Sequence, residues 1–226
     1  FITANINHRV FNNKLPYTSG GIVEYERIAP ELRIRSVIKK KILDRPVNFI
    51  AGADFAIQRD KRKRFDNNNG TKGNKAIDRL ETVHNLGPYV RVEWEWNKQI
   101  ELAGGFRFDS THFNLEDAFL EDGDQSDSRT LSEWSGTLGS VYHMNEATHF
   151  YTNIASVFET PTTTELTKDP SGGSGFNPNL NSQKSINYEM GLKSKTNKNN
   201  KLDLALFLIQ SRDELIPFEL DASPGN

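Results

Sequence analysis

Apolar and polar residues alternate one by one along several stretches of the chain. In residues 184–195, Ile186, Tyr188, Met190 and Leu192 occupy every second position, and polar or small residues lie between them. This period of two is typical of a β-strand with one apolar and one polar face. The same pattern, or a shorter version of it, predicts further strands in residues 31–39, 49–57, 89–96, 102–111, 132–143, 147–158 and 202–208. The chain is therefore expected to consist of half-buried strands.

Short turns and longer polar intervals separate these strands. Short turns are predicted at residues 43–46, 97–99, 144–147 and 196–200, where turn-forming residues gather. Longer loops are predicted at the charged residues 59–79, the acidic residues 115–129 and the Gly-, Ser- and Pro-rich residues 160–182. The first part of the chain, residues 1–30, is typical of short strands broken by turns. We expect roughly nine or ten strands joined alternately by short turns and long loops.

Composition argues against a helical membrane protein and is compatible with transmembrane strands. Of the 226 residues, 35% are hydrophobic and 26% are charged, and no apolar run approaches the roughly 18 residues of a spanning helix. Transmembrane barrels alternate lipid-facing and lumen-facing residues, and place short turns at the periplasmic rim and long loops outside. We therefore predict an all-β fold, an antiparallel transmembrane β-barrel fragment with long extracellular loops and short periplasmic turns. Trp94 and Trp96 are expected in an interfacial aromatic girdle.

The residue types that commonly act in catalysis form no recognised catalytic motif in this sequence. The formal net charge of −2 offers no global basic field for nucleic acid, and the absence of cysteine excludes disulfides and thiolate sites. The five histidines form no His-x-x-x-His or His-Glu-x-x-His pair, and the chain has neither a Gly-x-Ser-x-Gly elbow nor a phosphate-binding loop. We therefore expect no catalytic residues, no metal ligands, no cofactor and no nucleic-acid partner.

Two motifs flank the loop at residues 160–182. The first has the spacing Phe-x-x-Pro-Thr-x-x-Glu-Leu and the second has the spacing Tyr-Glu-x-Gly. Together they resemble the late barrel strands of TonB-dependent outer-membrane receptors, although Ser182-Gln183 stands where that family more often has Pro-Glu. The matching residues, which we expect to be structural, are Phe158, Pro161, Glu165, Leu166, Tyr188, Glu189 and Gly191.

The resemblance implies a function and a set of partners. Such receptors lie in the outer membrane of Gram-negative bacteria, bind a ferric siderophore and import it with energy delivered by the TonB complex through a plug domain. It implies as partners the siderophore, TonB, outer-membrane lipid and lipopolysaccharide. The chain carries no visible signal peptide and too few strands for a plugged barrel of about 22 strands. We therefore expect residues 1–226 to be a partial β-barrel domain, with the plug and the remaining strands outside this chain.

Two groups of residues are candidates for ligand binding. Basic residues crowd the predicted loop at 59–79, where they are suited to attract an anionic chelate or lipopolysaccharide phosphates. Polar residues on the expected lumen face of the strands form the second group, although mutual pairing as wall charges is the alternative for them. The candidates in these two groups are Arg59, Arg62, Arg64, Arg107, Asp109, Tyr151 and Asn153.

Two other functions fit the same pattern of strands. A passive porin-like or adhesive barrel would select solutes or bind partners through its loops without energy coupling. A soluble β-sandwich binding module would pack the apolar faces of its strands against each other. Fold alone does not choose among such functions.

Overall fold

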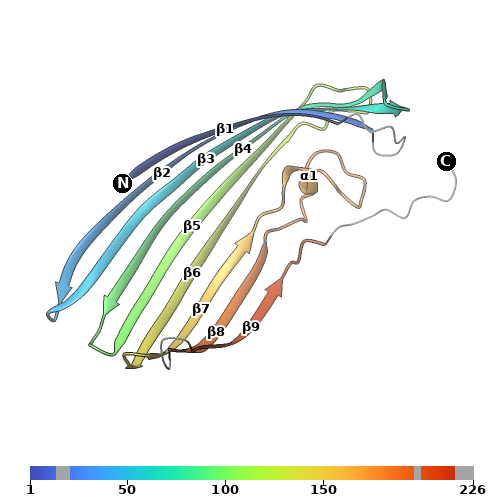
Figure 1. Ribbon diagram of the computed structural model, residues 1–226. Helices are drawn as coiled ribbons and strands as arrows, with labels where there is room; N and C mark the ends of the chain where they lie inside the picture. The colour runs from blue at the N-terminus through green and yellow to red at the C-terminus, as the bar shows by residue number, and fades with distance from the viewer. Residues whose placement is uncertain (14–20, 196–199, 217–226) are drawn as a thin grey trace.

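The computed structural model of the chain describes residues 1–13, 21–195 and 200–216. In these residues, nine strands form one antiparallel sheet in which each strand pairs with its neighbours in sequence (Figure 1). The strands are β1 (Ile2–Asn13), β2 (Ile22–Ile42), β3 (Arg45–Asn68), β4 (Thr71–Glu95), β5 (Ile100–Asp117), β6 (Asp127–Asn145), β7 (Thr148–Glu159), β8 (Gln183–Lys195) and β9 (Lys201–Arg212). The predicted all-β, antiparallel class is confirmed.

The described residues contain one short helix, which lies outside the sheet. It is α1 (Thr163–Leu166), and it lies in the connection between β7 and β8. No helix in the described ranges is long and apolar enough to cross a membrane.

One face of the sheet, which we call the outer face, is apolar across the width from β2 to β9. Residues paired across antiparallel strands point to the same face, so the strand register defines rows of neighbouring side chains. One such row consists of Ile38, Phe49, Val92, Gly104, Leu138, Ile154, Tyr188 and Leu208. Leu138 is 65% exposed and Leu208 is 56% exposed. This face is not covered by a second sheet in the described residues, which removes the basis for a β-sandwich.

Aromatic side chains bound the apolar band of the outer face. On β6 the outward positions run from Trp134 through Leu138 to Tyr142. The Trp134 ring lies 4.8 Å from that of Phe108 on the neighbouring strand. Tyr142 pairs across strands with Phe150. Aromatic rings at both edges of an apolar band are typical of strands that cross a bilayer.

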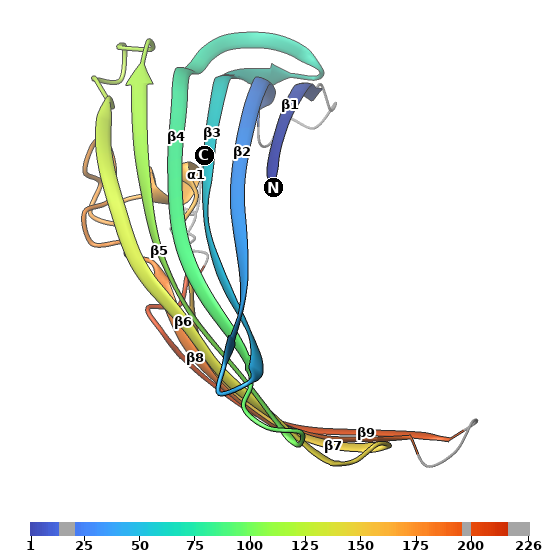
Figure 2. The same ribbon diagram turned by 90° about the vertical axis from the view of Figure 1, so that its left-hand side faces the viewer.

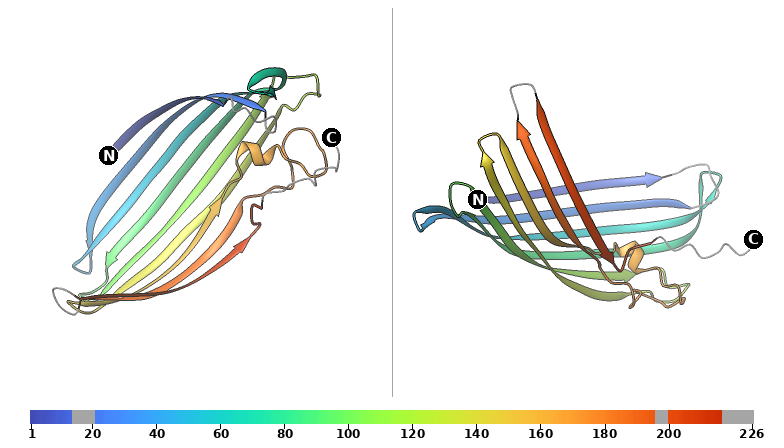
Figure 3. Two further views of the ribbon diagram at one scale, coloured as in Figure 1. Left: turned by 45° about the vertical axis from the view of Figure 1, so that its right-hand side comes forward. Right: turned by 90° about the horizontal axis from the view of Figure 1, so that it is seen from below.

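The opposite face, which we call the inner face, is concave and polar. The sheet curves along its width, and the connection that contains α1 lies against its inner face (Figures 2 and 3). A small hydrophobic core joins this connection to the wall, and Val83 and Leu180 pack at its edge. The core consists of Phe113, Leu115, Leu131, Leu166 and Phe176. It fixes the β7–β8 connection above the inner face.

Three of the four predicted short turns are present. They lie at residues 43–44, 96–99 and 146–147. The fourth, at 196–200, falls almost entirely outside the described residues, as does part of the predicted short strands in residues 1–30.

One predicted loop and one set of predicted short strands were wrong. Residues 59–79 are not a loop, because β3 and β4 continue through them and meet at residues 69–70. Asn69 and Gly70 have φ angles of 54° and 88°, and an Asn-Gly pair with positive φ is the preferred two-residue hairpin turn. The first 13 residues likewise form one continuous strand, β1, instead of short broken ones.

The two faces predict responses of different size to a charge on β6. Leu138→Lys places a charge in the middle of the outer apolar band and should lower the free energy of unfolding in lipid by about 2–4 kcal/mol. Ser135→Lys, on the inner face of the same strand, should change it far less. Urea unfolding of the full-length protein in vesicles, followed by tryptophan fluorescence, measures both. Equal losses for the two variants would contradict the assignment of the faces.

Candidate ligand-binding site

The predicted ligand-binding residues separate between the two faces. Arg107 and Asp109 on β5 and Tyr151 and Asn153 on β7 lie on the inner face, as expected from their alternation. The three arginines of β3 are divided, because a strand sends successive side chains to opposite faces. Arg62 points to the inner face with its neighbour Glu81, whereas Arg59 pairs with Ile28 and Thr82 on the outer face. The prediction that these arginines share one loop was wrong.

Arg107 is the centre of an ion-pair network on the inner face. Its Nε and Nη2 donate to the two carboxylate oxygens of Asp109 at 2.6 and 2.7 Å, and its Nη1 donates to Asp54 at 2.6 Å. The guanidinium also lies 5.8 Å from the centroid of the Tyr89 ring. Bidentate pairing fixes the planar guanidinium more firmly than a single contact. The network therefore acts as an ordered part of the wall.

A glycine makes this network possible. A Cβ atom built on Gly87 would collide with Nη2 of Arg107, and would lie 2.6 Å from a carboxylate oxygen of Asp109. Gly191 has the same relation to Tyr151, whose ring would lie 2.5 Å from an added Cβ. Glycine in a strand often marks such a close approach. Both glycines let a bulky inner-face side chain lie flat on the neighbouring strand.

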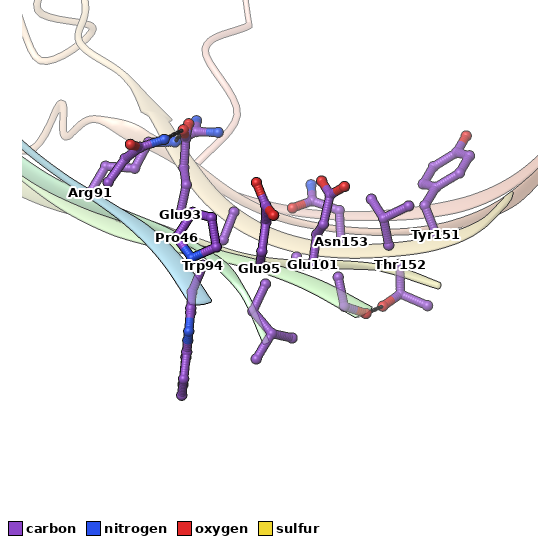
Figure 4. Close-up of a pocket in the computed structure, with 15 residues that line it drawn as sticks. Pro46, Arg91, Glu93, Trp94, Glu95, Glu101, Tyr151, Thr152 and Asn153 are labelled. Carbon is purple, nitrogen blue, oxygen red and sulfur yellow. Dashed lines mark hydrogen bonds and ion pairs between the residues drawn. The ribbon is translucent and has the colours of Figure 1, made fainter. Parts of the chain in front are cut away.

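Tyr151 and Asn153 belong to the half of the inner face near the short turns. The Tyr151 hydroxyl donates to Glu189 at 2.8 Å, and Asn153 accepts a hydrogen bond from Thr137 at 3.0 Å. A cavity of about 520 Å³ opens here, and its inner-face lining includes Glu93. Figure 4 shows Tyr151, Asn153 and Glu93 on the concave side of the sheet, and Trp94 on the other side.

Arg62 and Arg64 lie at the other end of the inner face. They line a polar cavity of about 350 Å³ between β3, β4, the β5–β6 connection and the β7–β8 connection. Arg62 donates to the hydroxyl of Thr164 in α1 at 2.7 Å. The lining also includes Arg79, Lys168, Asp117 and Asp122, and sequence reasoning did not single out these residues as part of a site. The contact between β3 and α1 joins residues 102 positions apart, which no local pattern indicates.

The motif residues before β8 hold the β7–β8 connection in place. Thr162 and Glu165 form a reciprocal capping box, in which the Thr162 hydroxyl accepts from the Glu165 backbone and the Glu165 carboxylate accepts from the Thr162 backbone. Leu166 is fully buried in the small core, and Pro161 is also among the fully buried residues. Pro161, Glu165 and Leu166 are thus held in the β7–β8 connection by burial and by the capping box.

Arg129 anchors the far end of the same connection. Its guanidinium donates to the carbonyl oxygens of Asn177 and Pro178 and to the side chain of Asn181. From the acidic connection, the Asp127 carboxylate accepts from the backbone of Phe176 at 2.9 Å. The β5–β6 and β7–β8 connections are thus tied to each other.

Carboxylates of these connections are engaged in local turns. The Ser126 hydroxyl and backbone N–H hold the pKa of Asp124 below its ordinary value, and Ser171 has the same effect on the pKa of Asp169. In the described part of the chain, no group of three or more His, Cys, Asp or Glu side chains is arranged to hold a metal ion.

Comparison with known proteins places the fold. A family model described as TonB dependent receptor-like, beta-barrel matches residues 5–226. The ferric yersiniabactin uptake receptor FyuA from Yersinia pestis is similar over 94% of this chain, with 17% identity and a TM-score of 0.66. The ferric citrate transporter FecA is similar over 93%, with 14% identity and a TM-score of 0.74. The copper transporter OprC is similar over 94%, with 15% identity and a TM-score of 0.67.

These likenesses concern a part of each solved protein. The chain spans 33% of FyuA, 31% of FecA and 35% of OprC. At identities this low, the likeness to the solved structures shows the fold alone.

The close approach at Gly87 generates a test of the Arg107 network. Gly87→Ala should lower the free energy of unfolding by about 1–3 kcal/mol, because the new methyl group displaces the guanidinium from its carboxylates. Gly104→Ala is the matched control, since an added Cβ meets its nearest atom at 3.5 Å, and it should cost about 0.5 kcal/mol or less.

A double-mutant cycle shows whether the cost of Gly87→Ala arises from the collision with Arg107. In an Arg107→Ala background, Gly87→Ala should cost clearly less than in the wild-type protein, because the guanidinium collision is gone and only the approach to the Asp109 carboxylate remains. Urea unfolding of the four variants measures the coupling. An undiminished cost of Gly87→Ala without Arg107 would contradict the role given to this glycine.

Proposed function

Because the chain belongs to the TonB-dependent receptor-like β-barrel family, we propose that it forms part of the wall of a receptor that binds and imports a ferric siderophore. In this proposal, TonB delivers the energy for import. Barrels of this family lie in the outer membrane of Gram-negative bacteria, and the exposed apolar outer face between aromatic edges agrees with that location. The family and its solved relatives are transport receptors, so the chain is not an enzyme.

The inner-face cavity at Arg62 and Arg64 is the observation that carries the ligand part of the proposal. Its guanidinium groups come from β3 and β4, and α1 holds one of them through Thr164. Guanidinium groups present several N–H donors in a fixed plane, which suits carboxylate, catecholate or hydroxamate oxygens of a ferric chelate. The chelate, and not the protein, supplies the ligands of the iron in this proposal.

The inner face has a second polar region that suits ligand passage or contact with a plug. Arg107, Asp109, Tyr151 and Asn153 all carry hydrogen bonds to neighbouring wall residues. In the proposal these residues keep the wall polar and ordered, while the cavity at Arg62 and Arg64 makes the first contact with the chelate. The aqueous lumen is where such polar side chains are expected in a barrel.

The open edges of the sheet indicate which further parts of the receptor the proposal requires. β1 and β9 each have one neighbour in the described residues, and a strand edge in hydrocarbon needs a pairing partner. We propose that the remaining barrel strands and a plug domain come from other parts of the same polypeptide, and that TonB acts through the plug. Lipid covers the outer face, and lipopolysaccharide surrounds the end of the barrel with long strands.

Charge reversal at the cavity tests the proposed function. Arg62→Glu combined with Arg64→Glu should weaken binding of an anionic ferric chelate by about tenfold or more, since charged hydrogen bonds contribute about 1.5–3 kcal/mol each. Arg59→Glu, on the outer face of the same strand, is the matched control and should leave affinity unchanged. Quenching of tryptophan fluorescence in the full-length protein measures affinity for ferric complexes of citrate, a catecholate and a hydroxamate.

The outcomes separate the rival functions. Uptake of a bound complex by cells with TonB, and its loss in cells without TonB, is expected. Uptake that is equal in both strains would favour a passive porin-like barrel. Failure of every ferric complex to bind the wild-type protein would overturn the siderophore proposal.

A further inference from the structure

Two histidines face each other across a strand pair near the short turns of the inner face. His143 on β6 and His149 on β7 are direct cross-strand partners on either side of residues 146–147. Their Nδ1 atoms lie 2.7 Å apart, and the rings are nearly perpendicular with centroids 4.6 Å apart. Both side chains are partly exposed. Two imidazole nitrogens thus meet at one point that is open to the lumen.

A carboxylate orients one of the two rings. Glu101 on β5 lies 2.8 Å from Nε2 of His143. An ionised carboxylate can only accept a hydrogen bond, so Nε2 is the donor and Nδ1 of a neutral His143 carries a lone pair. The short contact between the two Nδ1 atoms is then made by one proton of His149. An imidazole whose far N–H is held by a carboxylate is the usual arrangement of a metal-ligating histidine.

The surrounding charges favour a cation at this point. Glu95 lies directly opposite Glu101 in the strand register, and like charges in that position destabilise a sheet. In the part of the chain that the structure describes, Glu95 has no ion-pair partner. Lys193, opposite His149, is directed to the Tyr151 ring, with its Nζ 5.3 Å from the centroid. A bound cation would offset the repulsion between the two glutamates.

We propose that His143 and His149 chelate a divalent transition-metal ion through their Nδ1 atoms, with copper(II) as the best fit. The ion takes the place of the proton between the rings, His149 adopts the tautomer that carries its proton on Nε2, and water fills the remaining coordination positions. Metal–imidazole bonds of about 2.0–2.1 Å put two adjacent nitrogens about 2.9 Å apart around a square-planar ion and about 3.4 Å apart around a tetrahedral one. The two Nδ1 atoms are at hydrogen-bond distance, 2.7 Å, so a small separation brings both onto one square-planar ion, the geometry that copper(II) and nickel(II) prefer.

A second histidine pair on the outer face provides an internal comparison. His84 and His112 are also cross-strand partners, but their ring centroids are 6.5 Å apart. Nδ1 of His112 is engaged with the Thr130 hydroxyl at 2.9 Å. This pair offers no converging nitrogens, although its sequence setting in two adjacent strands is similar. It is therefore the matched control for the inner pair.

The test is copper binding to the full-length protein in detergent. Calorimetric titration with Cu²⁺ should show one site, and electron paramagnetic resonance should show coupling to two equivalent nitrogens. His143→Gln and His149→Gln should each weaken binding at least tenfold and abolish the two-nitrogen signal, because one ligand is lost. His84→Gln should change neither. Circular dichroism checks that each variant is folded.

A variant that keeps both imidazoles tests the role of the carboxylate. Glu101→Gln should weaken Cu²⁺ binding by about tenfold while the two-nitrogen signal remains, since outer-shell partners typically change affinity by 10–100-fold. The proposal is overturned if the wild-type protein binds Cu²⁺ no more tightly than His143→Gln, or if His84→Gln loses the signal instead. The site is independent of the ferric-chelate proposal, so Arg62→Glu with Arg64→Glu should leave Cu²⁺ binding intact.

Discussion

The need to pair every backbone N–H and C=O group inside hydrocarbon governs this structure. A lipid-exposed strand has no water to satisfy these groups, so it must hydrogen-bond to strands on both sides. The chain meets that need with one sheet in which β1 to β9 follow each other without a crossover. The same need makes the open edges at β1 and β9 incomplete by themselves. A full barrel is the arrangement that removes such edges.

The two faces of the sheet show how the chain divides its side chains between two environments. The outer rows present leucine, isoleucine and aromatic rings, while the inner face is a layer of mutually paired charges such as Arg107 with Asp54 and Asp109. Glycines at positions 87 and 191 give the inner layer room to lie flat. The polar layer is ordered by this pairing, and at the end that carries α1 it also contacts the β7–β8 connection through Arg62 and Thr164.

The sequence predicted correctly those strands in which apolar and polar residues alternate with a period of two. It found the strands around residues 49–57, 89–96 and 184–195, because one side of each meets an apolar environment. It failed at 59–79, where both faces of β3 and β4 carry charges, so alternation in hydropathy disappears although the strands continue. The Asn69-Gly70 turn was the local signal that would have corrected this prediction.

The candidate site was harder to predict from the sequence than the fold. Whether Arg62 or Arg59 faces the lumen depends on an exact register, and one residue of error reverses the answer. The contact from Arg62 to Thr164 depends on how a long connection folds over the wall. Neither follows from residue type. By contrast, the capping box of Thr162 and Glu165 and the burial of Leu166 are local consequences of the motif itself.

The strictly sequential strand order also bears on how the molecule assembles. Every strand pairs only with the strands just before and just after it, so most loop closures are short and carry a small entropy cost, the β7–β8 connection being the long exception. The two-residue turns at residues 43–44 and 69–70 are among the most local of these steps. The sheet can therefore grow by zipping, one hairpin added to the last, without waiting for distant parts of the chain. Because its strands pair only with neighbours in sequence, a wall of this kind has low contact order for an all-β protein, which favours fast folding.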